Sequence, residues 1–229
     1  MFARASGVSM GPQGAVHQPN RQGLVNKPGP VLPALSPGQV VGLEGPTGLG
    51  LTRLGLSLLA APSRVGMVVV LDARGWLSPI SAWEVGVIPD RLVLIRCDDR
   101  RLWPQVAAAV LDGVAAVYAE VPVGVGEQQL RRLAALNRAR RAALMLRPLR
   151  GDLPAGLAHL RIRGTGVAWE GVDRGHGRLT RRRVSLMISG KSLPLREIEI
   201  EDLKSHVSTT HTPLDLAALD RSPRLRGDS

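Results

Sequence analysis

The chain has 229 residues, of which 44% are hydrophobic and only 3% aromatic, which suits one compact domain with an aliphatic core. Its single cysteine excludes an intramolecular disulfide framework and a cysteine-based metal cluster. No apolar run is long enough to span a membrane, and the net charge of +11 leaves phosphate backbones or acidic protein surfaces as expected partners.

In chain order, residues 1–35 are rich in Gly, Pro, Gln and Asn and are expected to form a flexible arm. From Val40 onward, short apolar runs alternate with helix-like segments. The predicted strands are residues 40–43, 65–71, 92–95, 114–119 and 142–146, and the predicted helices are 54–60, 78–86, 102–111 and 127–140. This alternation predicts an α/β fold with a mostly parallel sheet covered by helices on both faces.

After Pro148 the pattern changes to shorter, strand-rich segments. Residues 160–164, 167–172 and 182–188 are predicted to be antiparallel strands joined by glycine-rich turns such as residues 173–177. We expect residues 36–200 to form one domain and residues 201–229 a flexible tail with a short helix-prone stretch at 214–219. The N-terminus carries no export pattern, so a cytoplasmic location is expected.

Residues 45–52 read G-P-T-G-L-G-L-T, which is a phosphate-loop motif, G-x-x-x-x-G-K-[ST], with Leu51 in place of the lysine. The motif follows an apolar run and precedes a helix-like stretch, as a phosphate loop does. Backbone amides at Gly45, Gly48 and Gly50 can hold a phosphate without the lysine, with Thr52 beside a metal ion. The alternative is that these glycines only form a tight turn and the site is vestigial.

Basic residues are concentrated in one part of the chain. Residues 131–183 hold 14 Arg against 3 Asp and Glu, whereas the remainder is neutral. The densest cluster provides the candidate nucleic-acid or partner-binding residues, which are Arg178, Arg181, Arg182 and Arg183. Strand alternation would place Arg181 and Arg183 on one face, where a DNA backbone or an acidic partner can reach them. An ordinary solvated sheet face is the other interpretation of the same pattern.

Three segments in series resemble bacterial RecA recombinases. Residues 45–54 resemble the loop G-P-E-S-S-G-K-T-T-L, and residues 70–80 resemble the run F-I-D-A-E-H-A-L-D-P-x-Y. Residues 114–120 resemble the hydrophobic strand that ends in the magnesium-associated aspartate. The similarity extends over residues 35–148 and implies a RecA-like P-loop core, with antiparallel strands following it.

Three departures from the recombinase pattern concern function. Leu51 replaces the phosphate lysine, Arg74 stands where the family has its water-activating glutamate, and Glu120 stands at the aspartate position. A guanidinium stays protonated and cannot act as a base, and losing the lysine costs about two orders of magnitude in phosphate affinity. We therefore expect no enzyme activity and no bound ATP or Mg²⁺, and the five histidines show no metal-ligand spacing.

A catalytically degenerate, arginine-rich RecA-like chain of this length resembles the ImuA family, and the L-M-L-R-P-L stretch at residues 144–149 adds to the resemblance. The resemblance implies a damage-induced accessory factor of error-prone translesion DNA synthesis. Its implied partners are an ImuB-like Y-family polymerase homologue and an error-prone replicative-type polymerase. A SulA-like cell-division inhibitor and a RecA paralogue that still binds ATP or DNA are the alternatives.

Overall fold

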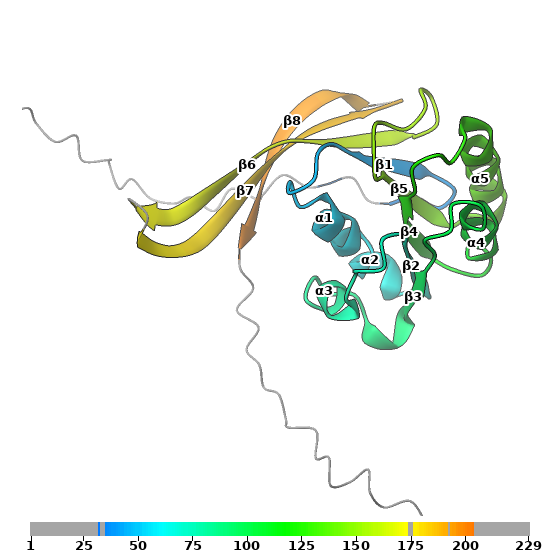
Figure 1. Ribbon diagram of the computed structural model, residues 1–229, viewed down its shortest axis with the longest axis horizontal. Helices are drawn as coiled ribbons and strands as arrows, with labels where there is room; N and C mark the ends of the chain where they lie inside the picture. The colour runs from blue at the N-terminus through cyan, green and yellow to red at the C-terminus, as the bar shows by residue number, and fades with distance from the viewer. Residues whose placement is uncertain (1–31, 33–34, 174–175, 192, 204–229) are drawn as a thin grey trace, which may run out of the picture.

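The computed structural model describes residues 32, 35–173, 176–191 and 193–203. In this part of the chain one mixed sheet has helices on both faces, so the predicted α/β class is confirmed (Figure 1). The strands are β1 Val40–Glu44, β2 Val68–Asp72, β3 Leu92–Arg96, β4 Ala116–Val121, β5 Ala143–Pro148, β6 Leu160–Asp173, β7 His176–Gly190 and β8 Leu193–Leu203. The helices are α1 Leu51–Leu58, α2 Ala60–Ser63, α3 Pro79–Trp83, α4 Trp103–Ala109 and α5 Glu127–Arg140, with a 3₁₀ turn at Pro89–Arg91.

The sheet has the order β3-β2-β4-β5-β1-β6-β7-β8. Neighbouring strands from β3 through β6 run parallel, whereas β7 and β8 are antiparallel to their neighbours. Because parallel strands share a direction, β1, β2, β4 and β5 end at the same edge of the sheet. Polar residues at the ends of four separate chain segments are thereby brought together.

The prediction of two short strands at residues 160–164 and 167–172 was wrong. They form one strand, β6, whose start pairs parallel to β1 and whose whole length pairs antiparallel to β7. The glycines that suggested a turn, Gly164 and Gly166, instead flank a register shift within the ladder, where glycine commonly accommodates a bulge. The third predicted strand lies within β7.

Strand β8 was missed because Pro194 follows its first residue and its outer positions are charged. Proline is tolerated at the start of a strand, and the inward residues Ile198 and Ile200 pack against the core. The predicted domain end at residue 200 therefore falls within β8, and residues 204–229, with the helix-prone stretch, lie outside the described residues. In the predicted N-terminal arm, Leu32 and Leu35 pack against the core, and the other positions up to residue 34 lie outside the described part.

Two apolar clusters hold the helices to the sheet. One joins the strands to α4 and α5 through residues such as Trp103 and Leu133, and the other joins α1 and α3 to the opposite face through Leu56, Tyr118 and Ala82. In Figure 1, α1 to α3 lie on one side of the strands and α4 and α5 on the other, while the β6–β7 hairpin projects away from the helices. Among the described helices none is long and apolar enough to cross a bilayer.

Helix α1 packs very closely on the sheet at Gly55. A Cβ built there would lie 2.3 Å from Cε2 of Tyr118 and 2.8 Å from Cδ1 of Leu43. Both distances are shorter than a Cβ atom has to its non-bonded neighbours in real proteins. Gly55 is buried inside the helix, where alanine would ordinarily be the more stable residue. The close approach of α1 to β4 therefore requires glycine at this position.

We predict that Gly55→Ala lowers the free energy of unfolding by about 1–3 kcal/mol, because overpacking outweighs the gain in helix propensity. Denaturant unfolding followed by circular dichroism measures it. Gly126→Ala is the matched control, since its φ is −73° and its new Cβ would meet only Oε1 of Gln129 at 3.7 Å. A stabilised Gly55→Ala variant would contradict the close packing.

His159 joins β1 to the chain just before β6. The backbone N–H of Val40 donates to Nδ1 of His159 at 3.1 Å, and the backbone N–H of His159 donates to the Val40 carbonyl at 2.8 Å. Burial lowers the pKa of His159 below its usual 6.5, and the charges of Lys191 and Arg138 lower it further. The folded protein therefore keeps this imidazole neutral, with Nδ1 as an acceptor.

This pKa shift predicts a stability loss on mild acidification. The unfolded chain takes up a proton at about pH 6.5, whereas the folded imidazole resists it, so its stabilisation is present above pH 6.5 and declines as pH falls toward the lower folded pKa. Denaturant unfolding at pH 7.5 and pH 5.5 should show a larger loss for the natural chain than for His159→Asn. Equal losses of unfolding free energy in both proteins would refute the lowered pKa of His159.

Candidate functional site

The glycine loop lies between the end of β1 and the start of α1, in the strand–turn–helix context that the sequence predicted. Gly48 and Gly50 have φ of 87° and 72°, a region that glycine enters without strain. Gly50 is the N-cap of α1, and no side chain caps the helix. The first turn of α1 therefore points its amides into the space above the loop, where an anion is favoured.

Leu51 is a core residue rather than a loop residue. Its side chain is 1% exposed and belongs to the same cluster as Ile162 of β6 and Val184 of β7. The position that the motif gives to a lysine is thus filled by an apolar side chain turned toward the sheet. Thr52 is half-buried and lines the cavity above the loop.

Arg74 and Glu120 form an ion pair at the ends of β2 and β4. Nε of Arg74 donates to Oε2 of Glu120 at 3.0 Å, and an Nη of the same guanidinium contacts the other carboxylate oxygen. Glu120 is fully buried, so its charge relies on this arginine. The Arg74 guanidinium also stacks on Trp76, 3.9 Å from the ring centroid, as cation–π pairs do.

Asp72 shapes the turn that carries Arg74. Its buried carboxylate accepts backbone N–H bonds from Arg74 at 3.1 Å, Gly75 at 2.9 Å and Leu77 at 2.8 Å. These bonds satisfy the buried charge locally and fix the direction in which the chain leaves β2. The aspartate therefore positions Arg74 over Glu120.

Arg147 on β5 is the site residue that sequence reasoning missed. It is 5% exposed, and its Nε and Nη1 find no acceptor among the residues that the structure describes. Burial lowers the pKa of Arg147, as does the charge of Arg74, while Tyr118 and Glu120 raise it. The sequence signal that could have identified Arg147 is that it is the one charged residue in an otherwise apolar run, residues 143–148.

The predicted arginine cluster divides between the two faces of the β6–β7 hairpin. Arg181 and Arg183 are exposed and form ion pairs, Arg181 with Glu201 at 3.3 Å and Arg183 with Glu170. Arg182 turns the other way, toward the loop, with its guanidinium carbon 5.4 Å from the Trp169 ring centroid. The side chain of Arg178 lies outside the described residues.

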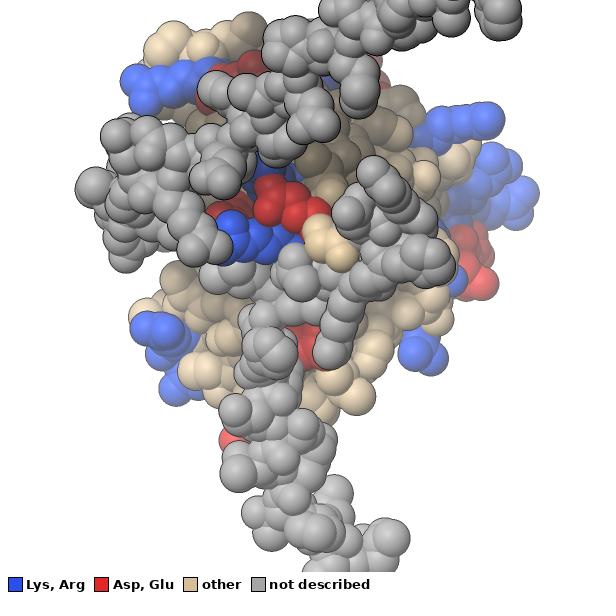
Figure 2. Space-filling view, turned by 90° about the vertical axis from the view of Figure 1, so that its left-hand side faces the viewer, with Lys and Arg blue, Asp and Glu red and all other residues tan. Residues whose placement is uncertain are grey.

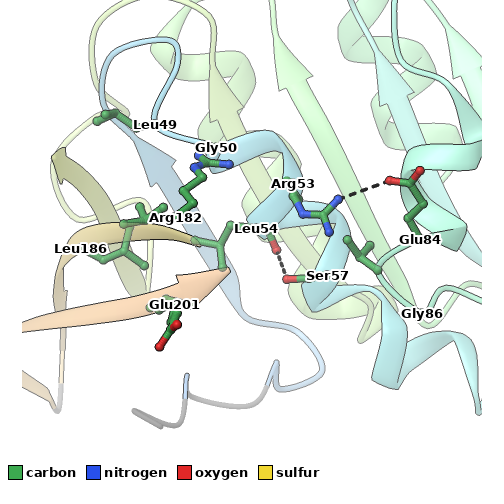
Figure 3. Close-up of a pocket in the computed structure, with 13 residues that line it drawn as sticks. Leu49, Gly50, Arg53, Leu54, Ser57, Glu84, Gly86, Arg182, Leu186 and Glu201 are labelled. Atoms are coloured by element: carbon green, nitrogen blue, oxygen red, sulfur yellow. Dashed lines mark hydrogen bonds and ion pairs between the residues drawn. The ribbon is translucent and has the colours of Figure 1, made fainter. Parts of the chain in front are cut away.

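Arg182 reaches the start of α1. Figure 3 shows it extending from β7 to Gly50, and a Cβ at Gly50 would overlap its guanidinium. On the face seen in Figure 2, Lys and Arg lie in several separate groups, and acidic atoms lie against one of them near the centre.

Three cavities surround the loop. One of about 530 Å³ lies above it and is lined by Thr47, Gly48, Gly50, Leu51, Thr52, Arg74, Arg147 and Arg182, among others. A second, of about 510 Å³, lies beside Gly45 and also reaches Arg74 and Arg147. A third, of about 430 Å³, lies between α1, the end of α3 and the β7–β8 ladder, flanked by the Arg53–Glu84 ion pair (Figure 3).

The family model described as the MT3502 N-terminal domain matches residues 30–152, more than half of the chain. The chain belongs to the MT3502 N-terminal domain family. The match contains β1 to β5, the loop, Arg74, Glu120 and Arg147, and ends before β6. No curated protein matches the chain.

The site of this MT3502-family chain offers cations rather than metal ligands. Within the described residues no group of three or more His, Cys, Asp or Glu is arranged to hold a metal ion. Glu44, at the end of β1, is also occupied, because it accepts from the Leu153 N–H at 3.1 Å and pairs with Arg161 and Arg163. The loop, Glu120 and Arg182 lie together, whereas Arg181 and Arg183 lie away from them.

We predict that removing one partner of the Arg74–Glu120 pair destabilises the protein strongly. Arg74→Met leaves a buried carboxylate without its guanidinium and should cost about 3 kcal/mol. The double variant Arg74→Met with Glu120→Gln should cost clearly less than the two single losses added together. Urea unfolding of all four proteins measures the coupling energy, and strict additivity would show that the pair contributes nothing.

Proposed function

We propose that this chain is a non-catalytic, RecA-like accessory protein of an error-prone translesion DNA synthesis complex. It acts in the cytoplasm during the DNA damage response and holds proteins together rather than turning over a nucleotide. Its partners are an ImuB-like homologue of Y-family polymerases and an error-prone replicative-type polymerase. The single observation that carries the non-catalytic part is the closed Arg74–Glu120 ion pair.

The ion pair supports the loss of hydrolysis in two ways. Arg74 occupies the place of the base, and a guanidinium cannot accept a proton from water. Glu120, the acidic residue at the metal-associated position, has both oxygens engaged by that arginine, so a metal ion would have to displace it. The buried Leu51 adds a third obstacle, because a lysine there would place an ammonium in the apolar core.

The sheet supports a RecA-like P-loop core. The loop follows β1, and the acidic or basic residues at the ends of β2, β4 and β5 lie at the same edge. In open α/β sheets, ligands are bound beyond the carboxyl ends of the parallel strands. A chain that keeps this arrangement but fills it with an internal ion pair fits a former nucleotide-binding domain reused as a scaffold.

Exposed tryptophans support a role in protein binding. The chain has four Trp, and three of them are substantially exposed, namely Trp76 at 66%, Trp83 at 43% and Trp169 at 50%. Trp83 lies one turn from Ile80 on α3, which is 55% exposed, so the two present one apolar surface. Tryptophan is enriched at the energetic centres of protein interfaces.

We predict that the purified chain shows no ATP turnover above background, with or without single-stranded DNA. The variant Leu51→Lys with Arg74→Glu should also stay at background, because Leu51 faces the core and Arg74→Glu places a second carboxylate against Glu120. A phosphate-release assay measures both proteins. Turnover by the natural chain would refute the non-catalytic proposal and favour the alternative of an active RecA paralogue.

The partner assignment is tested by co-purification from cells exposed to a DNA-damaging agent. The tagged chain should retain the ImuB-like protein, and Ile80→Ala with Trp83→Ala should reduce that retention several-fold. Leu102→Ala with Val123→Ala is the matched control, since these apolar residues are 52% and 57% exposed elsewhere on the surface. Retention of a division protein in place of a polymerase homologue would favour the SulA-like alternative.

A further inference from the structure

Arg147 is a buried cation whose hydrogen-bonding capacity is largely unused. Its Nε and Nη1 have no acceptor within the described part of the chain, although the residue is only 5% exposed to solvent. Leaving a buried charged donor unsatisfied is costly, and proteins ordinarily avoid it. The Glu120 carboxylate attracts Arg147, but both its oxygens already accept from Arg74.

Arg147 faces both cavities next to the loop. The cavity of about 530 Å³ brings Arg147 of β5 together with Arg182 of β7 and with Arg74 in the turn after β2, and no Asp or Glu among the described residues lines it. Several cations around one space repel one another and attract a counter-anion. The volume is within the range of small-ligand sites.

The same cavity receives the N-terminal end of α1. This eight-residue helix has no side-chain cap at Gly50, so the cavity contains uncapped amides and the positive end of the helix. Thr47, Gly48 and Thr52 complete this wall. Amides, hydroxyls and a guanidinium are together the donors that proteins use for phosphate oxygens.

We propose that the cavity above the loop binds a small phosphate oxyanion without a metal ion, with Arg147 of β5 providing the cation that the loop lacks at Leu51. The ligand class is inorganic phosphate, pyrophosphate or the phosphate end of a nucleotide. This site is additional to the partner-binding role and does not rest on it.

Thermal unfolding with added pyrophosphate tests the site in the full chain. With EDTA present to remove metal ions, pyrophosphate at about 100 times its Kd should raise the unfolding midpoint by about 5–10 °C. Arg147→Met should weaken binding by about 10- to 100-fold, measured by calorimetry. Without ligand this variant should unfold at the same temperature or higher, since it removes an unsatisfied buried charge.

Two further variants separate a specific site from general attraction. Arg150→Met removes a neighbouring exposed arginine that lines only the second cavity and should leave pyrophosphate binding unchanged. Arg147→Lys should retain part of the affinity. Equal binding by Arg147→Met and the natural chain, binding that requires Mg²⁺, or no response to pyrophosphate would each overturn the proposal.

The source of the phosphate is resolved by comparing ligands. Inorganic phosphate, pyrophosphate and ADP test the small-ligand arms, and an oligonucleotide without terminal phosphates tests a phosphodiester. Trp76 and Trp169, which line the cavity, provide a fluorescence signal for each titration. A response to the oligonucleotide alone would overturn the small-oxyanion site in favour of nucleic-acid contact. None of these outcomes alters which proteins co-purify, so the two proposals fail separately.

Discussion

Buried charge at the carboxyl edge of the parallel sheet is the constraint around which this molecule is organised. Glu44, Asp72, Glu120 and Arg147 stand at or near the ends of four neighbouring strands, and each is almost fully removed from water. A buried charge must be neutralised or hydrogen-bonded, or it opposes folding. The geometry of the loop region follows from how each of these charges is satisfied.

The four charges are satisfied to different degrees. Asp72 accepts backbone amides, and Glu44 and Glu120 are held by arginines from other strands or turns. These three are closed internally and stabilise the edge of the sheet. Of these four, Arg147 alone has donors without acceptors in the described residues, and it lines two of the cavities around the loop.

An edge of the sheet that is closed by internal ion pairs supports the proposal of a RecA-like fold without hydrolysis. The strand–turn–helix geometry is retained because Gly55, Leu51 and Tyr118 pack the helix onto the sheet, which is a matter of stability and not of chemistry. Arg74 and Glu120, which stand at the base and metal positions of the resemblance, pair with each other and become part of the scaffold. The exposed tryptophans are the surface features that the proposed partners would contact.

Local pattern alone determined the α/β class, the order of the elements from β1 to β5 and the glycine loop, because periodicity and turn residues act over a few positions. It also predicted, from Leu51 and Arg74, that the chain does not hydrolyse a nucleotide, and this stays a prediction. Tertiary structure alone decided that residues 160–173 form one strand and that another strand continues through Pro194. It also decided that Arg182 turns to the loop while its neighbours turn away, and that Arg147 is buried without acceptors for Nε and Nη1 among the described residues. These outcomes involve residues far apart in the chain, and pairing across strands is set by the packed sheet rather than by local sequence.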